Sequence, residues 1–195
     1  MCSIVGLDGL YPTIKIIKYT KKIAIANKES IICGWNLITK IAKKFNTKLI
    51  PIDSEHFSIW YALKNENSKN IEKLYITASG GPFYKIPIKS FKNIKVKNAL
   101  KHPNWSMGKK ISIDSSTLMN KALELIEARY LFDLSPNKIE TIIHPEGLIH
   151  SFVELNDGTL LASMASPDMK IPISYGLGYP DMVSNNFPKI NLQKL

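Results

Sequence analysis

The chain has 195 residues, with 45% hydrophobic and 22% charged side chains and a formal net charge of +10 at pH 7. These proportions exclude a disordered or membrane-embedded chain, and the lack of a long apolar run or a secretory signal predicts a cytoplasmic protein without a membrane partner. The lysines are spread along the chain and Arg129 is the only arginine, so we expect no nucleic-acid partner and keep a basic nucleic-acid-binding module as a remote alternative.

The first third of the chain alternates strand-like and helix-like segments. We expect strands at 3–6, 21–26 and 47–52, a helix that starts near Pro12, and a second helix at 27–45. This alternation is typical of parallel strands joined by right-handed crossovers. Ligands of such sheets bind beyond the carboxyl ends of the strands.

The pattern changes in the second half of the chain. After a strand at 73–78, we expect a helix at about 115–132 and strands at 138–145, 147–155 and 159–165. The sequence "NDGT" predicts a hairpin turn between the last two strands. The tail from about 180 is loop-like.

Polar side chains follow the strand that ends in "LIPI". Asp53 and Glu55, with a third acid from elsewhere, would form an all-oxygen site suited to Mg²⁺ or Mn²⁺. The alternative is that Asp53 or Ser54 only caps the helix "EHFSIWYAL".

The helix at about 115–132 offers further ligands. Asn120, Glu124 and Glu127 lie on one face, next to Lys121, and could hold a phosphate and a metal or form an exposed polar face. We expect a residue of 114–116 to cap this helix. Its expected core residues are Leu118, Ala122, Leu125 and Phe132.

Two loops could also contribute to a site. In "ASGGPF", Ser79 and the flexible Gly80 and Gly81 could bring main-chain N–H groups to an anion, or form an ordinary turn. In "HPNWSMG", Trp105 could serve as a lid or pack against the surface. Three histidines, His102, His144 and His150, could transfer protons near neutral pH if the fold brings them together.

From about residue 3 to about 180, several segments resemble those of the 1-deoxy-D-xylulose 5-phosphate reductoisomerase family in their residues and in their order. These are "ANKES", "PIDSEH", "SGGPF", "HPNWSMGKKISIDSSTLMNKALELIEARYLF", "HPEGLIHS" and "SPDMKIPI". The resemblance implies a metal-dependent rearrangement of a phosphosugar and its reduction by NADPH to 2-C-methyl-D-erythritol 4-phosphate, in non-mevalonate isoprenoid biosynthesis. It also implies an α/β fold in which the end of a Rossmann-like parallel sheet (1–52) precedes an α+β catalytic domain with a mixed sheet (53–180) and a linker (181–195).

The resemblance implies roles for the matching residues. Asp53, Glu55 and Glu124 look like the ligands of Mn²⁺, Mg²⁺ or Co²⁺. The residues that look catalytic are Lys28, Glu55, His102 and His150. Those that look substrate-binding are Lys28, Ser54, Glu55, Ser79, His102, Trp105, Ser115, Asn120 and Lys121. Those that resemble NADPH contacts are Asn27, Glu29, Met107 and Gly108.

The chain also departs from the family pattern. It lacks the G-x-T-G-S-I-G phosphate loop, so we expect a fragment without most of the NADPH-binding domain and without the C-terminal helical domain. Glu146, Gly147 and Lys170 stand where Gln, Ser and Arg are usual. One interpretation is an enzyme half that is inactive alone and needs a separate nucleotide-binding chain. The other is a non-catalytic remnant that binds metal or dimerises through the strands after residue 138, and a homodimer is expected if the chain folds.

Overall fold

The computed structural model of the chain describes residues 1–64, 66–102, 107–184 and 186–194. Its helices are α1 (Leu10–Ile17), α2 (Lys28–Phe45), α3 (Ser54–Ala62), α4 (Val96–Ala99), α5 (Lys109–Ser116), α6 (Met119–Phe132) and α7 (Lys170–Gly178). Its strands are β1 (Lys22–Ile25), β2 (Lys48–Pro51), β3 (Ile71–Ala78), β4 (Ile139–Ile143), β5 (Ile149–Leu155) and β6 (Leu160–Met164). Within the described residues, none of these helices has both the length and the apolarity needed to cross a bilayer.

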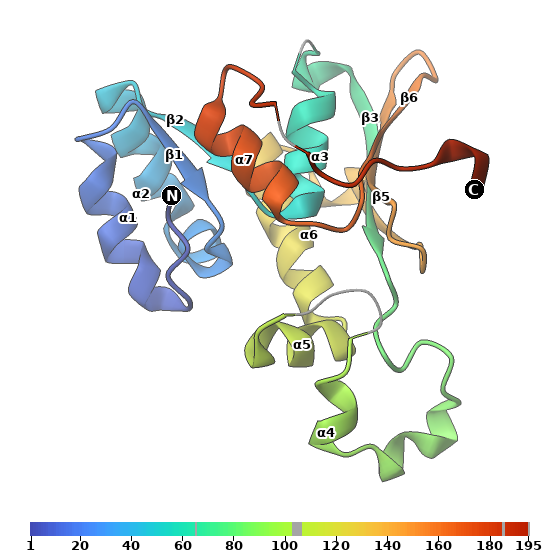
Figure 1. Ribbon diagram of the computed structural model, residues 1–195. Coiled ribbons are helices and arrows are strands. Elements are labelled where there is room, and N and C mark those ends of the chain that lie inside the picture. The colour runs from blue at the N-terminus through green and yellow to red at the C-terminus, as the bar shows by residue number, and fades with distance from the viewer. Residues whose placement is uncertain (65, 103–106, 185, 195) are drawn as a thin grey trace.

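The first sheet is a parallel pair formed by β1 and β2, with α1 and α2 beside it (Figure 1). The helix α2 begins where Asn27 accepts the Ser30 N–H at 2.6 Å, which satisfies one of the free donors at the helix start. Ile31 and Ile38 lie at helical spacing and are buried in the core of this part. The predicted strand, helix and strand of residues 21–52 are therefore confirmed.

The second sheet has four strands in the order β4-β3-β5-β6. β3 is parallel to β4 and antiparallel to β5, and β5 is antiparallel to β6. The helices α3 and α6 lie on one face of this sheet (Figure 1), where Leu74, Ile76, Ala128 and Val153 are fully buried. None of the described helices covers the other face. The predicted α/β class, with a parallel sheet followed by a mixed one, is confirmed.

The strand predicted at 3–6 is wrong. Among the described residues of this segment, only Cys2 pairs with β1, in one isolated bridge, and the chain then turns at Gly6, where φ is 76°. The Asn27 side-chain amide donates hydrogen bonds to the main-chain carbonyls of Ile4 and Gly6. A side chain, rather than a neighbouring strand, therefore satisfies these carbonyls.

The single helix predicted at about 115–132 is two helices. Leu118, with a φ of 60°, turns the chain between α5 and α6. The predicted cap at 114–116 is wrong, because Ser116 donates its hydroxyl to a carbonyl of α5 and does not cap α6. Two of the expected core residues, Leu118 and Ala122, are exposed, whereas Leu125 and Phe132 pack inside. The helix α6 instead buries part of its polar face.

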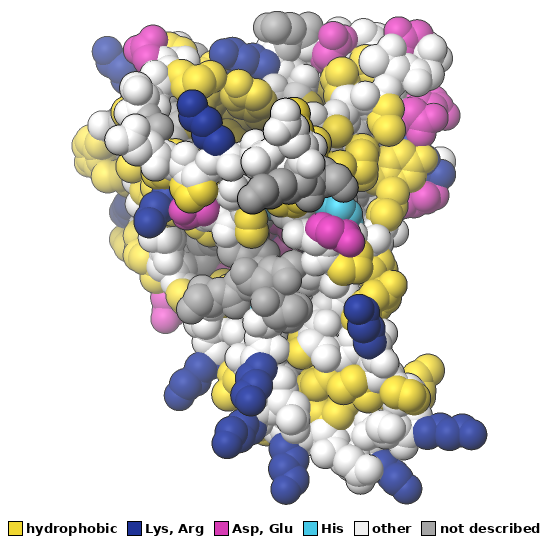
Figure 2. Space-filling view, turned by 45° about the vertical axis from the view of Figure 1, so that its right-hand side comes forward, with side chains coloured by type: hydrophobic (Ala, Val, Ile, Leu, Met, Phe, Trp, Pro, Cys, Tyr) yellow, Lys and Arg dark blue, Asp and Glu magenta, His cyan; other side chains and the backbone are white. Residues whose placement is uncertain are grey.

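Residues 80–101 project from the two sheets as a lobe that carries α4 (Figure 1). Between Glu72 and Asp114 the sequence has nine lysines and no acidic residue, and every lysine of the lobe is exposed. Lysine side chains surround this end of the molecule in Figure 2. Although lysines occur along the whole chain, positive charge is concentrated in the lobe.

Candidate functional site

Three strand ends from the two sheets converge on one pocket of about 270 Å³. The segments after β1 and β2 form one side of it, and the end of β3 forms another. Ligand sites at the carboxyl ends of parallel strands are a general feature of such folds. The predicted site residues that line the pocket are Lys28, Asp53, Ser54, Glu55, Ser79, His102, Met107, Ser115, Asn120, Lys121, Glu124 and His150.

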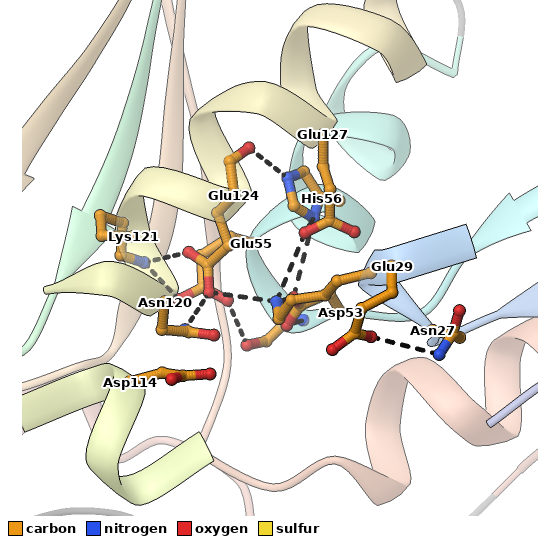
Figure 3. A network of polar contacts seen from close by, with 12 residues as sticks. Asn27, Glu29, Asp53, Glu55, His56, Asp114, Asn120, Lys121, Glu124 and Glu127 are labelled. Carbon is orange, nitrogen blue, oxygen red and sulfur yellow. Dashed lines mark hydrogen bonds and ion pairs between the residues drawn. The ribbon is translucent and has the colours of Figure 1, made fainter. Parts of the chain in front are cut away.

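Three carboxylates lie together in this pocket (Figure 3). Asp53 caps α3 by accepting the Ser54 N–H at 3.0 Å, Glu55 lies in the first turn of that helix, and Glu124 comes from α6. One oxygen of each lies within 4.8 Å of the corresponding oxygens of the other two. Asp53 is thus both a helix cap and part of the cluster, so the two alternatives for this residue are compatible. Three oxygen donors at this spacing suit a hard divalent cation.

Two lysines neutralise these carboxylates. The Lys28 ammonium contacts Asp53 and lies 3.4 Å from Glu124 Oε1. The Lys121 ammonium lies 2.9 Å from Glu55 Oε1 and also contacts Glu124. Because Glu124 is only 1% exposed, its charge requires partners of this kind. The expectation of an exposed polar face on α6 is therefore wrong.

The ion pairs shift the pKa values of the site in a consistent direction. Burial alone would lower the pKa of Lys28 and of Lys121, but the surrounding carboxylates, Glu124 first, raise both above the ordinary lysine value. Burial alone would raise the pKa of Glu55, but the Lys121 ammonium and the Ser54 hydroxyl hold it well below the ordinary value. All three groups are therefore charged at neutral pH.

The lining of the pocket also includes several hydrogen-bond donors. Ser79 Oγ and His102 Nε2 are hydrogen-bonded at 3.1 Å, and burial lowers the pKa of His102, which favours the neutral imidazole. Gly81 has a φ of 71°, and a Cβ atom there would lie 2.9 Å from the main-chain oxygen of Ser115. Glycine therefore lets the end of β3 approach α5 closely, so that the serines at 79 and 115 share one wall with Asn120.

His150 lies on β5 and is also buried in the pocket wall. Burial lowers its pKa, and the Glu55 carboxylate opposes this effect in part. His144 lines the same pocket and accepts a hydrogen bond from the Ile149 N–H at 3.2 Å. The three histidines His102, His144 and His150 thus do converge on one pocket.

Other predicted site residues lie outside the lining of the pocket. Asn27 is engaged as the cap of α2, Glu29 pairs with Lys110 at 2.9 Å, and Gly108 is the exposed residue before α5. Trp105 lies outside the described residues.

Two further buried polar residues, His56 and Glu127, lie behind the pocket, and only His56 was absent from the candidates of the sequence analysis. His56 is fully buried and its Nε2 lies 2.9 Å from the main-chain oxygen of Glu124. Glu127 is 1% exposed, and its Oε2 lies 3.4 Å from Lys28 Nζ. The sequence analysis placed Glu127 on the same helical face as Glu124 by this spacing, but gave it no individual role.

Comparison with known proteins identifies the family. The family model for the C-terminal domain of 1-deoxy-D-xylulose 5-phosphate reductoisomerase matches residues 49–132, and the model named for 1-deoxy-D-xylulose 5-phosphate reductoisomerase matches residues 1–34. The reductoisomerase of Pelagibacter ubique is 58% identical over 173 residues, which are 89% of this chain and 45% of that protein. The chain belongs to the 1-deoxy-D-xylulose 5-phosphate reductoisomerase family.

Further reductoisomerases support this assignment. That of Desulforamulus reducens is 50% identical over 190 residues, 97% of this chain and 49% of the relative. One similar solved structure is a crystal structure of a reductoisomerase in complex with NADPH, fosmidomycin and magnesium. Its TM-score is 0.92 and its sequence identity is 45%, and the match covers all of this chain and 50% of the chain in that structure. The Zymomonas mobilis reductoisomerase in complex with NADPH has a TM-score of 0.90 and 38% identity over the same shares. The chain spans about half the length of the curated relatives it matches.

Proposed function

We propose that the chain is the metal- and substrate-binding part of a 1-deoxy-D-xylulose 5-phosphate reductoisomerase, and that its substrate is this phosphosugar. The observation that carries the proposal is the union, in one pocket, of a three-carboxylate cluster and a wall of anion-binding side chains. Of the solved relatives that match all of this chain, one is a complex with NADPH, fosmidomycin and magnesium and another is a complex with magnesium. The proposed product is 2-C-methyl-D-erythritol 4-phosphate.

The residues present fit a divalent cation. Asp53, Glu55 and Glu124 supply oxygen donors at the required spacing, and they line the pocket. When bound, Mg²⁺, Mn²⁺ or Co²⁺ would polarise the substrate carbonyl as a Lewis acid. Because Lys28 and Lys121 already balance part of the acidic charge, the cluster is stable before it is loaded.

The protein side chains bind and orient the substrate. Ser79, Ser115, Asn120 and Lys121 are the proposed phosphate ligands, since they line the pocket with two hydroxyls, an amide and an ammonium, the last two of which contact Glu124. The contacts with the phosphate group are remote from the reacting carbons, so the binding energy that they provide can orient the substrate.

Other side chains face the reacting oxygens of the substrate. As an ammonium group, Lys28 can donate hydrogen bonds to a substrate oxygen beside the carboxylate cluster. Ser54 also lines the pocket with its hydroxyl group. His102 and His150 are the proposed neutral proton carriers, because burial lowers the pKa of both. His102 also contacts the proposed phosphate ligand Ser79.

We further propose that residues 1–52 belong to the NADPH-binding part of the enzyme and residues 53–180 to its catalytic part. Asn27, Glu29, Met107 and Gly108, with Trp105, are kept as proposed cofactor and lid residues on the family resemblance. The extent of the relatives supports the expectation that NADPH reduction requires residues beyond those of this chain, or a separate nucleotide-binding chain. A cytoplasmic location remains a prediction.

Calorimetric titration with 1-deoxy-D-xylulose 5-phosphate in the presence of Mg²⁺ tests the proposed function. We expect binding that requires both the cation and the phosphate group. The matched control ligand is 1-deoxy-D-xylulose, which lacks the phosphate. If the two sugars bind equally, or if chelation of Mg²⁺ has no effect, the proposed substrate and metal site are wrong.

The uncovered face of the four-stranded sheet supports a homodimer. On this face Tyr75 pairs with Phe152, and Phe152 pairs with Ala162, across three strands, while Leu160 on the same edge is 54% exposed. Lys73, Glu140 and Glu154 lie on the same face, and a surface that combines exposed apolar side chains with polar ones is typical of association surfaces. Sedimentation equilibrium tests the proposal: we expect a dimer that Phe152→Glu converts to a monomer, and a monomeric unsubstituted chain would contradict it.

A further inference from the structure

Glu127 is a buried carboxylate that touches the site from behind. It lies on α6 and is 1% exposed, and it is not among the described residues that line the pocket. Its Oε2 lies 3.4 Å from Lys28 Nζ and 3.9 Å from His56 Nδ1. Figure 3 shows Glu127 beside His56 and on the same helix as Glu124. A carboxylate buried this deeply requires a partner of opposite charge.

Lys28 is that partner, and it is shared. Its ammonium contacts Asp53 Oδ2, Glu124 Oε1 and Glu127 Oε2. Asp53 and Glu124 belong to the carboxylate cluster that fits a divalent cation. A cation and the ammonium would therefore compete for these two carboxylates, and they would also repel each other at short range in a poorly solvated site.

Glu127 differs from the other two carboxylates around Lys28. With Asp53 and His56 it forms a second group of possible metal ligands, but it lies outside the set of Asp53, Glu55 and Glu124, which lines the pocket. A cation held by the set in the pocket would leave the contact of Glu127 with Lys28 in place. His56 is fully buried beside Glu127 and is held by its hydrogen bond to the Glu124 carbonyl, and its Nδ1 lies 3.9 Å from both Glu127 Oε2 and Asp53 Oδ2.

We propose that Glu127 is the positioning residue that retains the Lys28 ammonium at the pocket wall when Asp53 and Glu124 hold a divalent cation. The inference rests on the proposed function, since it concerns the metal site of the reductoisomerase. Without Glu127, Lys28 keeps only the carboxylates that the cation requires. The ammonium then remains on Asp53 and Glu124 and weakens cation binding.

A double-mutant cycle on Mn²⁺ affinity tests this role without any measurement of activity. The four proteins are the unsubstituted chain, Glu127→Gln, Lys28→Met and the double variant, each titrated with Mn²⁺ and followed by the electron paramagnetic resonance signal of the free ion. We expect Glu127→Gln to weaken Mn²⁺ binding about tenfold when Lys28 is present, and by less than about threefold in the Lys28→Met background, as is usual for coupled neighbours.

The outcomes separate this proposal from the proposed function. An equal loss in both backgrounds, or no loss in either, overturns the role of Glu127 while the metal site stands. If the unsubstituted chain binds no Mn²⁺, the metal site itself is wrong and the role of Glu127 falls with it. Glu140→Gln, which removes the exposed ion pair with Lys73 on the sheet, is the matched control and should leave Mn²⁺ affinity unchanged.

A second variant keeps the test decisive if Glu127→Gln does not fold, as judged by circular dichroism. Glu127→Asp retains the charge on a shorter side chain, and we expect it to weaken Mn²⁺ binding by less than about threefold.

In ¹⁵N spectra, the Lys28 ammonium signal should stay protected from solvent exchange when Mg²⁺ saturates the unsubstituted chain. Loss of that protection on Mg²⁺ binding would show that Glu127 does not hold Lys28, and would overturn the proposal.

Discussion

Lys121 and Glu55 form an ion pair across two helices, with 2.9 Å between Nζ and Oε1, and their side chains are 9% and 16% exposed. The pair joins the wall proposed to bind phosphate to the carboxylate cluster proposed to bind metal. Its two members therefore influence both the stability of the chain and the binding of ligands.

The first prediction concerns acid stability. The pKa of Glu55 is lowered in the folded chain, so its contribution to stability is complete above its ordinary value of 4.5 and is lost as pH falls below that value. We expect the free energy of unfolding without metal to fall with decreasing pH in this range. Urea unfolding between about pH 3 and 7 should show a shallower decline for Glu55→Gln, which should also lose about 3 kcal/mol at neutral pH. Identical acid slopes for the two proteins would contradict the prediction.

The second prediction concerns Glu124. Removing one of three charged ligands should weaken Mn²⁺ binding strongly, so Glu124→Gln is expected to raise the Kd at least about tenfold. Calorimetry measures this change, and Glu154→Gln on β5, which bonds to Tyr75 at 2.9 Å, is the matched control. Equal affinity in the Glu124 variant would remove that residue from the ligand set.

The third prediction separates two effects of glycine. Gly81 and Gly158 both have positive φ, but an added Cβ would meet Ser115 only at Gly81, and at Gly158 it would meet no described atom within 4 Å. Both Gly81→Ala and Gly158→Ala should lose about 1 kcal/mol or more of stability because of backbone strain. Only Gly81→Ala should weaken phosphosugar binding, since it moves the wall that carries Ser79 and Ser115. Equal affinities of the two variants for the phosphosugar, measured by calorimetry, would contradict this prediction.

The fourth prediction concerns the lysine-rich lobe, which begins at the pocket residue Gly80 and is followed by the pocket residue His102. Exposed positive charge near a pocket accelerates the arrival of anionic ligands. Replacing Lys92, Lys95 and Lys97 by Gln should slow association of the phosphosugar severalfold at low salt. The difference should vanish near about 0.5 M salt, where charges are screened within a few ångströms. Stopped-flow measurements test this.

A control for the lobe comes from the far end of α2. Lys43 and Lys44 are exposed and lie about 24 Å along the helix from the pocket residue Lys28. Replacing them by Gln should change the association rate much less. An equal effect of the two sets would mean that only net charge matters, and that the position of the lobe does not.

The sequence by itself determined several of the elements and their order. Apolar residues at helical spacing predicted α2, "NDGT" predicted the turn between β5 and β6, and the spacing of Asn120, Glu124 and Glu127 placed them on one helical face. These features depend on residues within a few positions of each other, so local pattern is sufficient to predict them. The family resemblance supplied the candidate residues of the site.

Only the tertiary structure decided that the polar face of α6 is buried. The ammonium of Lys28, which is 96 positions earlier than Glu124 in the chain, pairs with both Glu124 and Glu127, whereas the nearby Lys121 pairs with Glu124 alone of the two. Likewise, β3 belongs to a different sheet from β1 and β2, yet its end meets theirs at the pocket. A charged face is stable inside a protein only when distant segments bring the opposite charge to it, and that pairing is a property of the fold as a whole.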